Sequence, residues 1–329
     1  MERRLRVGVA GVGSLGFHHA RLLKQLAAAE LVGVHDSDAA RLNQVAGELA
    51  VPPYRELSAL LQRVDALVVA VPTRAHESVA CAALERGIHV LVEKPIASTL
   101  AEADRILEAA DGTGALVQIG HVERFNGALR ACEPYLEEPL FVESHRLAPF
   151  GPRGTDVAVV LDLMIHDLDL VLSIARRDVV RIAAVGVPVL TSSPDIANAR
   201  LEFEGGGVAN LTASRVSLER LRKIRFFQRS GYISLDLAEG AGEFLRLRPG
   251  VVFEPGTPLS GASLAEVVER IPLRADGAEP LRCELESFCA AARGEAAVAV
   301  SGQDGRRALA VALDIVARIE RHVAHTTAA

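Results

Sequence analysis

A glycine-rich turn near the amino terminus has the spacing needed to bind a dinucleotide. Residues 11–16 read Gly-Val-Gly-Ser-Leu-Gly and lie between an apolar run, Leu5–Ala10, and a segment with a helical apolar face. In a G-x-G-x-x-G turn the first glycine permits the tight turn, the second lets a pyrophosphate approach the backbone, and the third lets helix and strand pack closely. The N-terminus of the helix then faces the phosphates. The predicted cofactor-binding residues of this turn are Gly11, Gly13, Ser14, Leu15 and Gly16.

An acid after the second apolar run bears on the choice of cofactor. Asp36 ends the segment that begins at Leu31, and it stands about 20 residues beyond the last glycine, where a carboxylate can accept hydrogen bonds from ribose hydroxyls. It would also repel a 2′-phosphate, and the nearest cation, Arg41, is expected one turn into the next helix, so NAD is favoured over NADP. A glycine-rich turn that binds no nucleotide is the alternative, and the order of strand, glycines, helix, strand and acid argues against it.

Three more polar segments follow apolar strands. Ligands of an open α/β sheet bind beyond the carboxyl ends of its strands, so these segments are expected beside the nucleotide. Lys94 is the sharpest candidate, because a cation at a strand end can reach a nicotinamide or a substrate hydroxyl; a surface lysine at a turn is the alternative. The segments are Pro72-Thr73 with His76, Glu93-Lys94-Pro95, and residues 120–126.

Asp162 and His166 can form an acid–base pair on one helix face. Residues four apart share a face, with Cβ atoms about 5–6 Å apart, and Asp169 follows three residues after His166. The surrounding segment is strongly apolar, so ionisable groups there need partners or a function. A core histidine held by a carboxylate is one alternative. A divalent metal site is another, but neither a cysteine nor a second histidine stands nearby at ligand spacing, so no metal is predicted.

Composition and charge restrict the class of protein. The chain has 329 residues, half of them hydrophobic, and a net charge of −6, which suggests two domains and argues against nucleic acid as a partner. The basic run Arg220–Arg229 is a local exception, either a solvated strand face or an anion-binding patch for a phosphorylated substrate. The four cysteines lack C-x-x-C spacing, and no signal peptide or membrane span is recognised, so a cytoplasmic location is expected.

The pattern of elements predicts an α/β fold in two parts. Residues 1–121 alternate strand and helix, which indicates a doubly wound parallel sheet. Residues 122–329 are expected to form an α+β domain with one large antiparallel sheet, and the segment Arg248–Pro280 a loop with a short helix near Ser263–Val268. The strands expected there are Phe141–Leu147, Val180–Leu190, Ala197–Phe203, Gly207–Val216, Lys223–Arg229 and Tyr232–Leu237, and the helices are Val157–Ala175, Leu281–Arg293 and Gly302–Ala324.

Taken together, these motifs resemble the Gfo/Idh/MocA oxidoreductases over nearly the whole chain. The resemblance implies a Rossmann domain followed by a C-terminal domain on a large, mostly antiparallel sheet, through which members form dimers or tetramers. It implies NAD as cofactor and a sugar or nucleotide-sugar substrate. The residues that carry it are Gly11-x-Gly13-x-x-Gly16, Pro72-Thr73 with His76, Glu93-Lys94-Pro95, Asp162-x-x-x-His166, Gly231-Tyr232-Ile233 with Asp236, and Val300–Gly305.

The resemblance also suggests roles for individual residues. Residues 120–126 and 212–215 are similar to members that oxidise the 3-hydroxyl of UDP-linked amino sugars. Inositol or free-aldose oxidation, a redox-assisted elimination, and a non-catalytic NAD-binding regulator are the alternatives. The implied catalytic residues are Lys94, Asp162 and His166; the cofactor-binding residues add Asp36, Pro72, Thr73, His76, Glu93 and Lys94 to the glycine turn; the substrate-binding residues are Lys94, Glu123, Arg124, Asn126, Asp162, His166 and Arg215.

Overall fold

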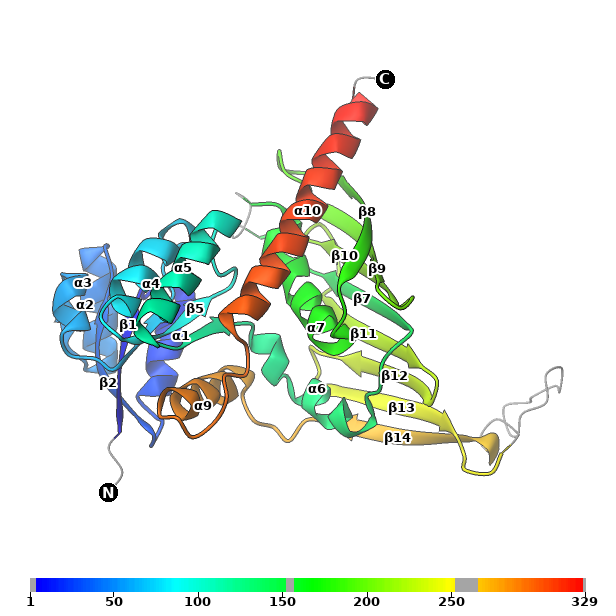
Figure 1. Ribbon diagram of the computed structural model, residues 1–329, viewed down its shortest axis with the longest axis horizontal. Coiled ribbons are helices and arrows are strands. Elements are labelled where there is room, and N and C mark those ends of the chain that lie inside the picture. Colours follow the sequence, from blue (N-terminus) through cyan, green and yellow to red (C-terminus); the bar gives the residue numbers. More distant parts are fainter. Residues whose placement is uncertain (1–3, 152–156, 252–265, 328–329) are drawn as a thin grey trace. The chain divides into compact units, whose positions relative to one another are not determined.

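The computed structural model describes residues 4–151, 157–251 and 266–327 in two compact units (Figure 1). Unit 1 comprises Met1–Val122 and Glu279–Ala310, and unit 2 comprises Glu123–Ala278 and Val311–Ala329. The sequence analysis placed one boundary after residue 121 and assigned everything beyond it to the second domain. In the structure, the segment Glu279–Ala310 instead returns to unit 1.

Unit 1 is built on a parallel six-stranded sheet, as predicted. Its strand order is β3-β2-β1-β4-β5-β6, so the order reverses beside β1, where doubly wound sheets bind their ligands. All four residues of β4 are buried, as expected for a strand covered by helices on both faces. The strands are β1 (Leu5–Ala10), β2 (Ala29–His35), β3 (Pro53–Tyr54), β4 (Ala66–Val69), β5 (His89–Glu93) and β6 (Val117–Gly120).

The helices of unit 1 begin and end largely where local signals predict. The side chain of Thr99 accepts a hydrogen bond from the N–H of Glu102, and the Glu102 carboxylate accepts one from the N–H of Thr99, which completes the expected capping box of α5. The carboxylate of Asp38 caps α2 in the same way. The helices are α1 (Ser14–Leu23), α2 (Ala39–Leu49), α3 (Leu57–Leu61), α4 (His76–Leu84) and α5 (Leu100–Thr113).

Two helices from the end of the chain complete unit 1. One face of α9 (Pro280–Ala292) joins the core that includes Val7 and Leu91 of the sheet. Beside it, the backbone N–H of Ile119 donates to the carbonyl of Val300 at 3.0 Å. The first turns of α10 (Gly302–Thr327) also lie against β6, because a Cβ at Gly305 would stand 2.6 Å from the Ile119 side chain. The residues of α9 in the core are Leu285, Phe288 and Cys289.

Unit 2 contains an eight-stranded sheet of order β14-β13-β12-β11-β7-β10-β9-β8. Neighbouring strands are antiparallel except for the parallel pair β7 and β10. Helices α6 (Gly127–Cys132) and α7 (Ile165–Ala175) pack against the sheet (Figure 1). The strands are β7 (Phe141–Leu147), β8 (Val179–Val187), β9 (Ile196–Phe203), β10 (Val208–Ser214), β11 (Leu221–Gln228), β12 (Gly231–Asp236), β13 (Ala241–Leu247) and β14 (Val268–Arg274).

Two expectations for unit 2 were wrong. Strands β13 and β14 were missed, and β14 occupies part of the segment that was expected to be a loop. Pro272 obscures β14 in the sequence, yet it is tolerated because β14 is the edge strand. The helix expected over Val157–Ala175 is a π-helix, Val160–Met164, followed by α7. The short helix expected near Ser263–Val268 lies largely outside the described residues. Among the helices that the structure describes, none is both long and apolar enough to cross a membrane.

Candidate functional site

The glycine turn of unit 1 has the shape of a pyrophosphate cradle. Gly11 adopts a positive φ of 85°, and a Cβ at Gly16 would stand 1.8 Å from the carbonyl oxygen of Gly11, so neither position accepts a side chain. At Gly13, by contrast, an added Cβ would meet no atom within 4 Å, which leaves its backbone facing open space. Ser14 and Leu15 are exposed beside it. The turn therefore fits a dinucleotide pyrophosphate at the N-terminus of α1.

Asp36 is held directly against this turn. One carboxylate oxygen accepts a hydrogen bond from the N–H of Val12 at 2.7 Å, and the other accepts one from the N–H of Asp38 at 2.9 Å. Arg41 is the third residue of α2 and reaches the same turn, where its Nε donates to the carbonyl of Val12 at 2.8 Å. The acid expected to bind ribose is thus positioned by the backbone of the loop that would bind the phosphates.

The polar segments after β4 and β5 are tied together by His76. Pro72 precedes a short 3-10 turn that begins at Thr73, and His76 is the first residue of α4. The buried His76 ring faces two backbone carbonyls, that of Pro95 at 2.9 Å and that of Val71 at 3.0 Å. Burial lowers the pKa of His76 despite these acceptors, so the neutral ring donates to one of them. The ring contacts the protein itself and holds the two segments together.

Glu93 is buried beneath the backbone of Lys94. One oxygen of its carboxylate accepts a hydrogen bond from His19 Nε2 at 2.6 Å, and the other accepts one from the N–H of Lys94 at 3.2 Å. Burial by itself would raise the pKa of Glu93, but His19 and Lys94 outweigh it, so the pKa lies below its usual value. Glu93 is therefore ionised, and it fixes the start of the segment that carries the half-buried Lys94.

A second buried acid, Glu284, was missed by the sequence analysis. It lies on α9, is fully buried, and neither carboxyl oxygen has a hydrogen-bond partner within the described ranges. Gln118 donates to its backbone carbonyl at 3.3 Å. Burial, together with the negative charge of Glu93, raises the pKa of Glu284 well above its usual value. No sequence signal distinguishes it, because a glutamate in an amphipathic helix resembles a surface residue.

This raised pKa makes stability depend on pH. Above the ordinary glutamate pKa, the folded protein keeps a proton at Glu284 that the unfolded chain has released, so the free energy of unfolding falls as pH rises towards the raised pKa. Glutamine keeps the shape and does not titrate. We expect the melting temperature of Glu284→Gln, relative to the unmodified protein, to increase by about 2–4 °C or more between pH 4.5 and pH 8.

Differential scanning calorimetry across this pH range would measure the effect. Glu286→Gln is the matched control, because Glu286 lies on the same helix, is exposed, and pairs with Arg282 at 3.0 Å. Its melting temperature relative to the unmodified protein should stay nearly constant with pH. A difference for Glu284→Gln that is equally flat across the range would show that Glu284 titrates normally.

The proposed base lies in unit 2. Asp162 is in the π-helix, and His166 is the second residue of α7; both are half-buried. Because a π turn intervenes, the regular four-residue spacing on one α-helical face does not apply to this pair. Single π turns within helices occur frequently at functional sites, where they re-aim a side chain. Lys94 belongs to unit 1.

A buried ion-pair network anchors the segment around His166, and its central residue, Arg146, was also missed. Arg146 is 4% exposed on β7 and binds both oxygens of Asp167, at 2.8 and 3.0 Å. Its remaining terminal nitrogen donates to Glu123 at 2.8 Å. Because Asp167 directly follows His166, this network fixes the first turn of α7 to the sheet. Burial alternates along β7 and puts Arg146 on the covered face, but the sequence of this strand has no apolar alternation that would have shown it.

The residues expected to bind substrate in unit 2 have partners within that unit. Asn126 Nδ2 donates to Glu123 at 3.0 Å and to the carbonyl of Leu237 at 2.9 Å. Arg124 forms a two-pronged ion pair with Asp169, at 2.6 and 2.8 Å. The remaining member, Arg215, is buried and donates to the carbonyl of Val157 at 2.6 Å.

The basic run divides between the two faces of β11. Lys223 pairs with Asp236 at 3.9 Å, and Arg225 pairs with Glu143 at 2.7 Å. Arg222 lies on the opposite face of the strand, on the same side as the buried Ile224. All three side chains are partly exposed, so exposure alone does not decide between a solvated strand face and an anion-binding patch.

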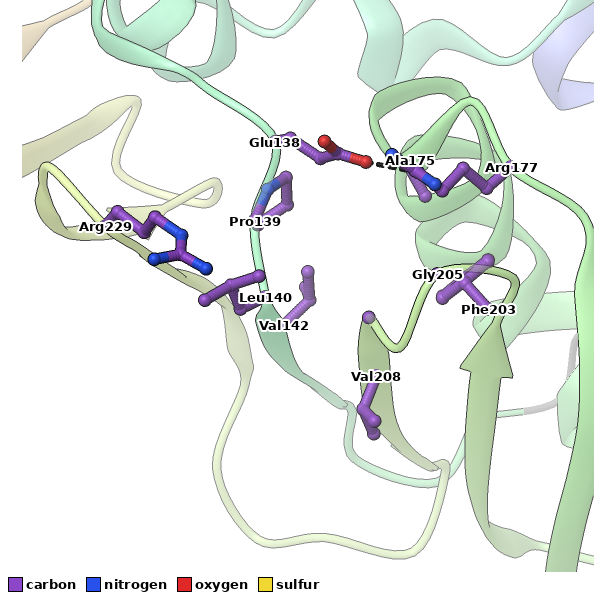
Figure 2. Close-up of a pocket in the computed structure, with 11 residues that line it drawn as sticks. Glu138, Pro139, Leu140, Val142, Ala175, Arg177, Phe203, Gly205, Val208 and Arg229 are labelled. Carbon is purple, nitrogen blue, oxygen red and sulfur yellow. Dashed lines mark hydrogen bonds and ion pairs between the residues drawn. The ribbon is translucent and has the colours of Figure 1, made fainter.

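Unit 2 also contains a pocket (Figure 2). It is lined by Leu140 and Val142 at the start of β7 and by Phe203 and Val208 of the β9–β10 hairpin. Glu138 and Arg177 form an ion pair at its edge. Arg229, the last residue of the basic run, also lines it, whereas the residues predicted to be catalytic or to bind cofactor or substrate do not. Within the described parts of the chain, no group of three or more His, Cys, Asp and Glu residues could hold a metal ion.

The parallel sheet, the open glycine turn and the fixed Asp36 define a dinucleotide-binding protein with a second domain built on a large sheet. The chain belongs to the Gfo/Idh/MocA family of oxidoreductases. Residues 5–121 match the family model described as an oxidoreductase family with an NAD-binding Rossmann fold, and residues 118–234 match the GFO/IDH/MocA C-terminal domain. The cofactor of this family, NAD, is the one that the sequence predicted.

Several known proteins are similar along nearly the whole chain. UDP-N-acetylglucosamine 3-dehydrogenase from Acidithiobacillus ferrooxidans is 37% identical over 96% of this chain and 97% of its own length. A solved structure of that enzyme covers 97% of this chain and 99% of its own, with a TM-score of 0.89 and 36% identity. Inositol 2-dehydrogenase 1 from Saccharopolyspora erythraea is 33% identical over 94% of this chain and 92% of its own length.

Proposed function

We propose that this protein oxidises the 3-hydroxyl of a UDP-linked amino sugar and uses NAD⁺ as the hydride acceptor. The observation that carries the proposal is the similarity, over nearly all of both chains, to a UDP-N-acetylglucosamine 3-dehydrogenase. The open glycine turn and Asp36 support the cofactor. Lys94, Asp162 and His166 supply the groups that oxidation of a secondary alcohol needs.

The proposed roles follow from the chemistry of the side chains. When bound, NAD⁺ supplies the acceptor for the hydride. His166 removes the hydroxyl proton as general base, and Asp162 stabilises the charged imidazole. Lys94 hydrogen-bonds the same hydroxyl and favours its developing negative charge. His76 and Glu93 position the segments around Lys94, since their side chains bind the backbone there.

For unit 2 we propose positioning roles beside the substrate role. Asn126 donates to Glu123, Glu123 accepts from Arg146, and Arg146 holds Asp167, the residue after His166. Arg124 holds Asp169 in the next part of the same turn. These contacts support a role in positioning His166. Any contact of Arg124, Asn126 or Arg215 with the sugar would be a second role of the same side chains.

A substrate panel tests the proposal. Purified protein with NAD⁺ is mixed with UDP-sugars, free sugars and inositols, and reduced nicotinamide is followed by absorbance. A signal with UDP-N-acetylglucosamine and none with the others is expected. A signal confined to inositols or free sugars would replace the substrate but keep the oxidoreductase. Product formation without net reduction would indicate a redox-assisted elimination, and NAD binding without any product would indicate a regulatory protein.

We also propose a homodimer or homotetramer in the cytoplasm. The exposed valines of β8, among them Val180, Val185 and Val187, support a contact between copies. The four free cysteines support a reducing compartment. Light scattering on the purified protein would measure the number of copies.

A further inference from the structure

We infer that Arg222 binds the diphosphate of the substrate. The inference rests on the proposed function, which supplies a nucleotide-linked sugar. Arg222 lies outside the motifs that carry the family resemblance.

The first observation is the position of Arg222 on the covered face of the sheet. It lies in register with Arg146 of the neighbouring strand β7, so the two side chains project to the same side about 5 Å apart at their Cβ atoms. Arg146 is buried and binds Asp167, the residue that follows His166. Arg222 is 43% exposed. It is therefore a solvent-accessible cation one strand away from the network that holds the proposed base.

The second observation is that Arg222 is weakly compensated. Its nearest carboxylate in the described part of the chain is Glu123, at 3.7 Å, and the same Glu123 oxygen already accepts from Arg146 at 2.8 Å. The other Glu123 oxygen accepts from Asn126. Burial and then the charge of Arg146 lower the pKa of Arg222, so its charged form lacks stabilisation that an anion would supply.

The chemistry of the substrate fits this arrangement. In a nucleotide-linked sugar the diphosphate is attached at C1, two ring carbons from the 3-hydroxyl. A cation that binds the diphosphate must therefore lie near the base that accepts the 3-hydroxyl proton, but not in contact with that hydroxyl. A guanidinium offers parallel N–H donors that match two phosphate oxygens, which a compact ammonium group does not.

The other cations of the basic run provide the contrast. Lys223 and Arg225 alternate with Arg222 and Ile224 along β11, so they point to the opposite face of the strand. There Lys223 pairs with Asp236, and Arg225 pairs with Glu143. They lie on the same strand as Arg222, carry the same charge and are similarly exposed. Of the three, Arg222 is the one on the face that carries the Asp167 network. Comparing substitutions at the three positions therefore shows whether a ligand needs a cation at this place or only a positive charge on the strand.

Titration of UDP into the NAD-saturated protein tests the inference. We expect Arg222→Gln to bind UDP about tenfold to a hundredfold more weakly, since a charge-assisted hydrogen bond is lost. The matched controls Lys223→Gln and Arg225→Gln should change the affinity less than about threefold. Equal affinity of Arg222→Gln and the unmodified protein would overturn the inference and leave the proposed function intact. An unmodified protein that neither binds UDP nor oxidises any UDP-sugar would overturn the proposed function.

A kinetic comparison separates phosphate binding from an effect on the fold. The Arg222→Gln variant should raise KM for the UDP-sugar and leave kcat within a fewfold of the original, because the diphosphate is remote from the reacting carbon. Arg222→Lys should recover part of the affinity. A variant that loses kcat with KM unchanged would place Arg222 in support of the base, and this would overturn the assignment to the diphosphate.

Discussion

Replacing His166 with asparagine should lower kcat by about 10²–10⁴-fold, the contribution typical of a general base. Asparagine is similar in size and keeps a hydrogen-bonding group, but it cannot accept the substrate proton. His166 lies in the first turn of α7, and the anchor of that turn is the neighbouring Asp167, which Arg146 holds. The fold of unit 2 should therefore survive the substitution, and the loss should fall on the chemical step.

The measurement is single-turnover reduction of NAD⁺ with saturating substrate, together with the dissociation constant of NAD⁺ from fluorescence titration. His145→Asn is the matched control, because His145 is half-buried on the open face of β7, opposite the face that carries Arg146. It should keep turnover within about threefold. If His166→Asn turned over nearly as fast as this control, His166 would not be the base.

Removing Arg146 should cost about 3–5 kcal/mol of the free energy of unfolding. Arg146 satisfies Asp167 and Glu123, whose side chains are 4% and 8% exposed. Arg146→Ala would leave two carboxylates buried without their cation, and an uncompensated buried charge is among the most costly changes a core can undergo. The expected loss of stability therefore comes mainly from the two carboxylates left buried without a cation, and less from the favourable energy of the ion pairs themselves.

Urea denaturation followed by circular dichroism would measure this loss. Arg225→Ala is the control on the next strand: its bond to Glu143 is as short, at 2.7 Å, but both side chains are about one third exposed. Such a pair contributes about 0–1 kcal/mol. If Arg146→Ala does not fold, the triple variant that also carries Asp167→Asn and Glu123→Gln should, because neither carboxylate of Arg146 is then left buried without its cation. Equal losses for Arg146→Ala and Arg225→Ala would mean that burial is not what gives this network its energy.

The sequence determined the parts of this protein that depend on local order. The glycine turn, the apolar strands around it and Asp36 are consecutive along the chain, and their spacing has one common structural solution. The capping box at Thr99 and Glu102 is equally local, and the structure contains it. The strands from Phe141 to Leu147 and from Ala197 to Phe203 were predicted with nearly the observed bounds. Along the second strand, apolar and polar residues alternate with the two-residue period of a half-buried strand.

Only the tertiary structure decided which segments pack together. The sequence of an amphipathic helix such as α9 shows that one face is buried, but it does not show which other elements cover that face. The place of α9 in unit 1 could therefore not be predicted. For the same reason Glu284 and Arg146 looked like surface residues, since a charged side chain reveals its burial only when its neighbours are known. Strand β14 was hidden by Pro272, which the edge of a sheet tolerates and a central strand does not. Motifs specified the chemistry of this protein, whereas non-local packing determined the electrostatics that support it.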